Sequence, residues 1–153
     1  MTRLLLISAI LLCFSNSFSQ KLERNVVVAF LESNVKAIID FDSTKIIAQT
    51  NFPLEGSWGY TIGLETEPAE WTKSDYTTNL ESIFTEELRT LLREKTYNDL
   101  THYANDAGEI QLIINLMSYY TDIETQETYE SSTILFFKKF DNEWKLFSIE
   151  YAG

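Results

Sequence analysis

Hydrophobic residues between Leu22 and Phe41 recur at three- and four-residue spacings. This spacing places them along one side of a helix, so the sequence predicts an amphipathic helix over this range. Ser33 and Asn34 mark the point at which the helix can kink. The residues of the apolar stripe are Leu22, Val26, Val27, Phe30, Leu31, Val35, Ile38 and Ile39.

A short second helix and a strand are predicted next. The stretch "DFDST" ends the first helix and offers Ser43 or Thr44 as the N-cap of a helix over "KIIAQT". Pro53 disfavours helical backbone angles at the residue before it, so we expect this helix to end near Asn51 and the chain to continue as a strand. Gly56 then supplies a turn.

Residues 58–64 have the alternating pattern of a strand. Trp58, Tyr60, Ile62 and Leu64 fall on one face, and glycine and threonine fall on the other. A brief return strand is expected over "AEWT", residues 69–72.

A second long amphipathic stripe runs from Tyr76 to about Glu94. Ser74 is its expected N-cap, with Asp75 in the first turn, where a negative charge suits the helix dipole. Thr85, followed by two glutamates, provides a second N-cap that divides this helix in two.

The last third of the chain changes to a period of two residues. Residues 100–120 read as two strands around an "NDAG" turn. Residues 127–140 and 143–151 read as two more, joined by Asp141-Asn142, a tight-turn pair. Runs such as "ILFF" are apolar on both faces, so we expect parts of the sheet to be covered on both sides. Helices first and strands last predict an α+β domain.

Three stretches resemble the nuclear-transport-factor-2-like superfamily, the fold also seen in ketosteroid isomerase, and in particular its small exported bacterial members. They are "KIIAQTNFPLEG", "WTKSDYTTNLESIFTEEL" and "STILFFKKFDNEWKLFSIEY". The resemblance implies N-terminal helices packed on a curved, mainly antiparallel sheet, which together form a cone with a central apolar cavity. Such cavities serve isomerases, dehydratases, ligand binders and protein-interaction domains, so the fold does not choose the function.

The N-terminus has the pattern of an export signal. Arg3 precedes the apolar run Leu4–Phe14, and Ser17-Phe18-Ser19 has the small-x-small form of a cleavage site. The run is shorter than the roughly 20 residues that span a bilayer, so we expect cleavage after Ser19 rather than a retained anchor. This prediction gives a signal peptide over 1–19, a single α+β domain over 20–153, and a periplasmic or secreted protein.

Charge and cysteine content narrow the classes of partner. The chain has 12 Lys plus Arg and 23 Asp plus Glu. Removing Arg3 with the signal leaves a net charge of 11 − 23 = −12. This negative charge disfavours binding to nucleic acids and to anionic membrane surfaces. Cys13 is the only cysteine and lies in the signal. One histidine and no thiol in residues 20–153 argue against a zinc or copper centre, and we expect no metal and no cofactor.

Five residues are candidates for a ligand-binding cavity: Trp58, Tyr60, His102, Tyr119 and Glu150. The aromatic side chains combine an apolar body with a polar group, which suits both a pocket and an ordinary core. His102 is the lone histidine. Glu150 has the strand parity of Trp144 and Leu146, so an inward orientation at the mouth of the cone is one alternative, but a solvated carboxylate at the end of the strand is the favoured one. No catalytic set is recognised, because these residues do not match an acid–base constellation.

Three hypotheses for the function remain open. The first is an exported, non-catalytic domain that binds a small apolar ligand or an envelope protein through its cavity or sheet face. The second is an isomerase or dehydratase with acid–base residues in the cavity, which requires two titratable side chains in one closed pocket. The third is a homodimeric structural module.

Overall fold

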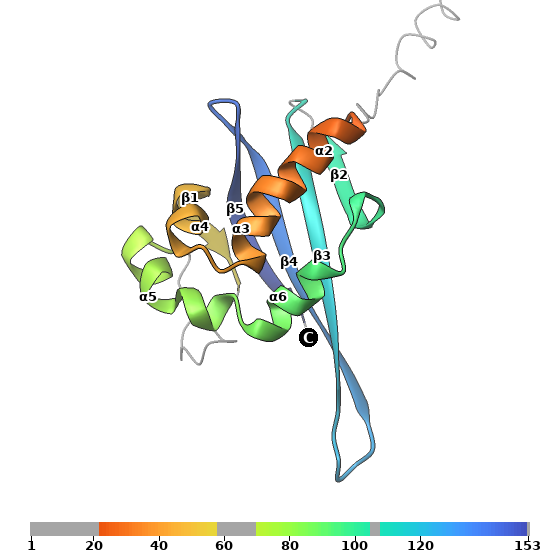
Figure 1. Ribbon diagram of the computed structural model, residues 1–153. Coiled ribbons are helices and arrows are strands. Elements are labelled where there is room, and N and C mark those ends of the chain that lie inside the picture. Colours follow the sequence, from red (N-terminus) through yellow and green to blue (C-terminus); the bar gives the residue numbers. More distant parts are fainter. Residues whose placement is uncertain (1–21, 58–69, 105–107, 153) are drawn as a thin grey trace, which may run out of the picture.

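Figure 1 shows a computed structural model of the chain, which describes residues 22–57, 70–104 and 108–152. The first helical stretch consists of α2 (Arg24–Phe30), the π-helical turn η1 (Leu31–Val35) and α3 (Lys36–Ile39). The helix predicted here is confirmed, and η1 contains the two residues at which a kink was expected. Helix α4 (Ser43–Ala48) follows, but its N-cap is Asp42, whose carboxylate accepts a hydrogen bond from Lys45 N at 3.1 Å. The expected cap at Ser43 or Thr44 is therefore wrong by one or two residues.

Strand β1 (Thr50–Gly56) begins where the proline was expected to end the helix. It contains a cis Phe52–Pro53 peptide bond. Leu54 and Trp71 form an isolated antiparallel bridge with two backbone hydrogen bonds, of 3.0 and 2.8 Å. This bridge lies within the brief return strand predicted over residues 69–72. The strand predicted over 58–64, with Trp58 and Tyr60, lies outside the described residues.

Two helices follow the bridge, α5 (Lys73–Ile83) and α6 (Glu86–Arg93), and the division predicted at Thr85 is confirmed. Thr85 is the N-cap of α6. The N-cap of α5 is Thr72 and not Ser74: its hydroxyl accepts from Asp75 N at 3.2 Å, and Asp75 accepts from Thr72 N at 3.3 Å. A short 3-10 turn, η3 (Tyr97–Asp99), leads into the sheet.

The last four strands are β2 (Leu100–Ala104), β3 (Ile110–Thr121), β4 (Thr128–Phe140) and β5 (Glu143–Ala152). Together with β1 they form one five-stranded sheet in the order β1-β5-β4-β3-β2. All neighbouring strands are antiparallel except β1 and β5, which are parallel. Asp141 and Asn142 have φ angles of 50° and 66°, as the tight turn between β4 and β5 requires. The predicted α+β fold with a mainly antiparallel sheet is confirmed.

A bulge in β5 corrects one prediction. Phe136 pairs with Ser148 and Phe137 with Leu146, so Phe147 has no partner in β4. The extra residue shifts the alternation of side chains. Beyond it, Ile149 pairs with the buried Leu135 on the helix-covered face. Glu150 pairs with Ile134, lies on the opposite face and is exposed, so it is the solvated carboxylate of the favoured interpretation and does not point inward.

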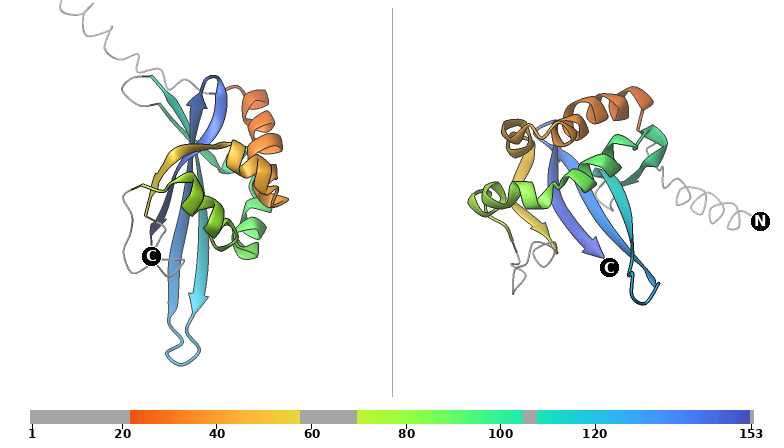
Figure 2. Two further views of the ribbon diagram at one scale, coloured as in Figure 1. Left: turned by 90° about the vertical axis from the view of Figure 1, so that its left-hand side faces the viewer. Right: turned by 60° about the horizontal axis from the view of Figure 1, so that its bottom comes forward.

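The helices lie on one side of the sheet (Figure 2), and the core fills the space between them. An interior cavity of only about 10 Å³ lies among Ile38, Ile46 and Phe137, less than one water molecule occupies. In the described part of the chain, the centre of the cone is thus packed rather than hollow at this point. The largest side chains with less than 2% exposure are Trp71, Tyr76, Phe30, Phe84 and Phe137.

Candidate binding groove

A groove of about 710 Å³ opens on the surface where helices meet the end of the sheet. Its walls come from α2 and η1 on one side and α4 on another, and its floor comes from the turn between β4 and β5. We refer to it as the basic groove, for the lysines described below. Its lining consists of Val26, Ala29, Phe30, Ser33, Asn34, Lys45, Ala48, Gln49, Lys139, Asn142, Glu143, Trp144 and Lys145.

Aromatic rings form the apolar part of the basic groove. Phe30 ends α2 and is buried, and its ring meets Phe137 edge-on at 4.9 Å and Trp144 at 5.8 Å between centroids. Trp144 is the second residue of β5, so the tight turn before it fixes its position. Because Trp144 is half-buried, part of its ring remains available to a bound group.

The π-helical turn η1 joins the helix to the sheet at this groove. It places Asn34 against β5, where this residue is only 5% exposed. Asn34 Nδ2 donates a hydrogen bond of 2.8 Å to the carbonyl oxygen of Trp144. Nearby, Gln49 Nε2 donates to Ser33 Oγ at 3.1 Å. Gln49 Oε1 is inaccessible and accepts no hydrogen bond from the described residues. The wall of the groove is therefore polar and fixed by hydrogen bonds.

Three lysines and one glutamate give the basic groove its charge. Lys45 pairs with Asp42 at 3.0 Å, and Lys145 lies 3.9 Å from Glu143. Lys139 Nζ lies 5.5 Å from the centroid of the Trp144 ring, and within the described ranges it has no ion pair. An aromatic surface beside an available ammonium group suits a ligand that joins an apolar body to a negative charge.

The three predicted site residues that the structure describes lie apart from one another. His102 pairs with Leu112 and lines a small pocket of about 170 Å³ with Val27 and Tyr97. Tyr119 is 66% exposed on the long hairpin of β3 and β4, and Glu150 is exposed on the opposite face of the sheet. Trp58 and Tyr60 fall outside the described residues, so their role in ligand binding stays a prediction.

Sequence reasoning missed the residues of the basic groove. A signal was present in the charge pattern: Lys138, Lys139 and Lys145 flank the predicted turn at Asp141-Asn142, in a chain with nearly twice as many acidic as basic residues. Trp144, inside the same segment, was interpreted only through its strand parity. The contribution of the first helix and of Gln49 could not be found in this way, because it depends on how distant segments pack.

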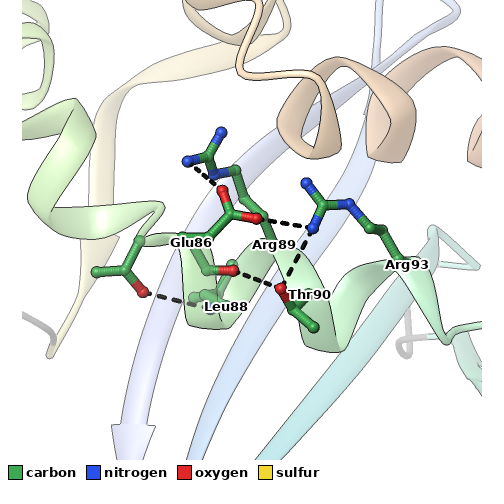
Figure 3. A network of polar contacts seen from close by, with 6 residues as sticks. Glu86, Leu88, Arg89, Thr90 and Arg93 are labelled. Carbon is green, nitrogen blue, oxygen red and sulfur yellow. Dashed lines mark hydrogen bonds and ion pairs between the residues drawn. The ribbon is translucent and has the colours of Figure 1, made fainter.

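A polar network on α6 is structural. Glu86 binds Arg89 Nη2 at 2.7 Å and Arg93 Nη1 at 2.8 Å, while Thr90 Oγ1 donates to the Glu86 carbonyl at 2.8 Å (Figure 3). The hydrogen bond from Arg93 is the main cause that lowers the pKa of Glu86. The Arg89 guanidinium also lies 4.8 Å from the centroid of the Phe41 ring, which connects α6 to the corner before α4.

The buried tyrosine of α5 is also structural. Tyr76 is fully buried, its ring meets Phe52 and Phe84 edge-on, and its hydroxyl shares a hydrogen bond of 3.2 Å with Thr50. Burial raises the pKa of Tyr76 far above its usual range, so the phenol stays protonated. Among the described residues, no three histidine, cysteine, aspartate or glutamate side chains cluster as metal ligands. Nor does any described helix have the length and apolar content to cross a membrane.

Comparison with known proteins gives matches in structure alone. Neither a protein-family model nor a curated protein matches the sequence. An NTF2-like protein of unknown function from Pseudomonas putida is similar, with a TM-score of 0.42 and 14% identity over 84% of each chain. A candidate ketosteroid isomerase from Shewanella frigidimarina has a TM-score of 0.41 and 14% identity over 84% of this chain and 92% of its own. ActVI-ORFA from Streptomyces coelicolor has a TM-score of 0.46 and 13% identity over 82% and 92%.

The identities, of 13 to 14%, and the TM-scores, of 0.41 to 0.46, are too low to transfer a family or an activity to this chain. The architecture itself agrees with the expectation from the sequence: helices precede the long strands, and they cover one face of a five-stranded sheet in which β1 runs parallel to β5. The described residues form the expected α+β fold, a layer of helices on a five-stranded sheet that is mainly antiparallel.

Proposed function

We propose that this protein is a non-catalytic binding domain whose site is the basic groove between α2, η1, α4 and the β4–β5 turn. The observation that carries the proposal is the contrast between two places in the fold. Among the described residues, large side chains pack around a cavity of only about 10 Å³ between the N-terminal helices and the sheet, whereas the basic groove offers about 710 Å³. Ligand pockets of proteins have volumes of roughly 300–1,000 Å³, so the groove has a suitable size.

The lining indicates the chemistry of the bound group. Trp144 and Phe30 provide apolar surface, and three lysines surround it with one glutamate among them. The chain as a whole has a net charge of −11, so the groove is a local exception that attracts a negative group at short range. The ligand is a small apolar molecule with an anionic group, or a segment of a protein with the same two features.

The setting of this binding is part of the proposal. Export through the N-terminal signal would place the domain in the periplasm or outside the cell, where an envelope protein or a small apolar anion could reach the groove. The acidic surface outside the groove supports solubility and disfavours nucleic acids.

The alternative of an isomerase or dehydratase has two candidate locations among the described residues. Glu87 and Tyr151 line one pocket, of about 220 Å³. Tyr97 and His102 line the other, of about 170 Å³, with Val27, Asn98, Leu100 and Leu112. This volume is below the usual range of ligand pockets, and none of these six residues is a carboxylate. If a reaction takes place there, His102→Ala abolishes turnover of a ketosteroid-like test substrate without affecting the basic groove. Such a turnover would reject the non-catalytic proposal.

Anilinonaphthalene sulfonate is a direct probe of the basic groove, because it joins aromatic rings to a sulfonate. We expect the purified protein to bind it with an increase in dye fluorescence, and Lys139→Glu or Trp144→Ala to weaken binding about tenfold, as the loss of one well-placed contact does. Lys73→Glu is the matched control, since this residue begins α5 and does not line the groove. Equal dye binding by all four proteins would contradict the proposal.

A further inference from the structure

The long hairpin of β3 and β4 exposes a group of large hydrophobic side chains. Residues 118–131, which we call the arm, extend beyond the helices at the bottom of Figure 1. Tyr119, Tyr120, Ile123 and Tyr129 are 66%, 64%, 83% and 51% exposed. Aromatic residues are enriched in protein interfaces, and an exposed apolar cluster of this kind marks an interaction site.

Hydrogen bonds hold the tip of the arm in one conformation. The carboxylate of Asp122 accepts from Glu124 N at 2.7 Å and from Thr125 N at 2.9 Å, and these bonds lower the pKa of Asp122. Tyr129 Oη donates to Glu127 at 2.8 Å. Ile123, the most exposed large hydrophobic residue of the described chain, is therefore presented by an ordered turn, which reduces the entropy lost when it binds.

The arm and the basic groove have opposite charge. The arm contains Asp122, Glu124, Glu127 and Glu130 and has no lysine, arginine or histidine, whereas three lysines and one glutamate line the groove. Both surfaces also contain aromatic rings. The two lie at opposite ends of β4, with the β4–β5 turn at the top of Figure 1 and the arm at the bottom. The arm of a chain therefore cannot reach the groove of the same chain.

We propose that the arm of one copy of this protein docks in the basic groove of a second copy. Ile123 and the neighbouring tyrosines would pack against Trp144 and Phe30, while the carboxylates of the arm approach Lys139 and Lys145. The inference rests on the proposed function, because it uses the same groove, and it names the partner. Each copy offers one arm and one groove, so the contact either is reciprocal in a two-fold symmetric dimer or repeats head-to-tail in larger rings or open chains.

Sedimentation velocity of the purified protein tests this directly. We expect the sedimentation coefficient to increase with protein concentration. It should fall toward the monomer value in about 1 M NaCl, where charges are screened within about 3 Å. A monomer at every concentration would overturn the inference, and so would a dimer that does not respond to salt.

Two variants identify the contact. Ile123→Asp alters the arm, and Lys139→Glu with Lys145→Glu alters the groove. We expect each variant alone to be monomeric. A one-to-one mixture should give dimers and nothing larger, because only one intact arm and one intact groove remain to meet. Glu81→Lys on α5 is the control and should associate like the unaltered protein. Circular dichroism of each variant confirms folding before the comparison.

The outcomes separate the two proposals. If the mixture stays monomeric, or if either variant alone still forms dimers, the arm-in-groove contact is wrong. Dye binding to the Ile123→Asp variant then reports on the groove independently: retained binding that Lys139→Glu weakens leaves the proposed function standing without the self-association. Loss of that dye response would reject the groove as a binding site as well.

Discussion

Gly56 shows how one residue can decide the path of β1. Its φ angle is +142°, and its backbone packs so closely on β5 that a Cβ atom would collide with the carbonyl oxygen of Ile149. Gly108 also has a positive φ, of +78°, but no atom of the described residues beyond its chain neighbours lies within 4 Å of the position of its Cβ. A side chain at Gly108 would therefore meet only the strain of a positive φ, whereas a side chain at Gly56 would meet both that strain and a steric overlap.

We predict that Gly56→Ala lowers the free energy of unfolding by more than about 2 kcal/mol, because the β1–β5 pair must separate to admit the methyl group. Gly108→Ala should cost only about 1 kcal/mol, the usual cost of a positive φ for a residue with a side chain. Urea unfolding of both variants measures the difference. Equal losses would show that the close contact with Ile149 does not form.

Glu86 makes stability depend on pH. Its hydrogen bond with Arg93 holds the pKa of the carboxyl below its usual range. A glutamate whose pKa is lower in the folded than in the unfolded chain stabilises the fold at any pH above its unfolded pKa of about 4.3. This stabilisation is lost as the pH falls through the pKa of the folded state. We predict that Glu86→Gln lowers the melting temperature slightly at pH 7, and that the difference from the unaltered protein disappears by about pH 2. A difference that persists in acid would contradict this cause.

At the scale of elements, the start of α5 has two candidate N-caps, Ser74 from the sequence and Thr72 from the structure. The sequence favoured Ser74, but the reciprocal hydrogen bonds involve Thr72 and Asp75. We predict that Thr72→Ala lowers the free energy of unfolding by about 1 kcal/mol, the usual value of an N-cap, whereas Ser74→Ala has little effect. Thermal unfolding of the two variants side by side measures this. A larger effect of Ser74→Ala would return the cap to the predicted position.

Much of the secondary structure could be predicted because each element carries its own periodic pattern. The turn at Asp141-Asn142 and the break before α6 followed from local side-chain chemistry. The bulge at Phe147 could not be predicted, since an extra residue in an apolar strand leaves the composition unchanged. That single residue moves Glu150 to the face opposite the one that strand parity alone indicates.

The candidate site was harder to predict than the fold for a physical reason. The basic groove combines Phe30, Gln49 and Trp144, which are far apart in the sequence and meet only through packing. Asn34 was seen as a kink point, but its bond to the Trp144 carbonyl depends on the π-helical turn. Residues that act together across elements leave no periodic signal in any one of them.

At the scale of the whole molecule, the proposed export predicts a processed chain. We expect protein recovered from its own host to begin at Gln20 and to lack Cys13, because Ser17-Phe18-Ser19 offers the cleavage site. Intact-mass measurement with N-terminal sequencing identifies the first residue, and no thiol should react with iodoacetamide. An intact Met1 or a modified Cys13 would show that the N-terminus is retained.

The position of β5 has a consequence for how this chain acquires its structure. Strand β5 lies between β1 and β4, and Thr50 of β1 pairs with Leu146 of β5, nearly a hundred residues further along the chain. Pairings between such distant segments form late, because a large loop must close first. Among the described strands, β1 pairs with β5 alone, so the β2–β3–β4 meander can assemble first and the addition of β5 then joins β1 to it.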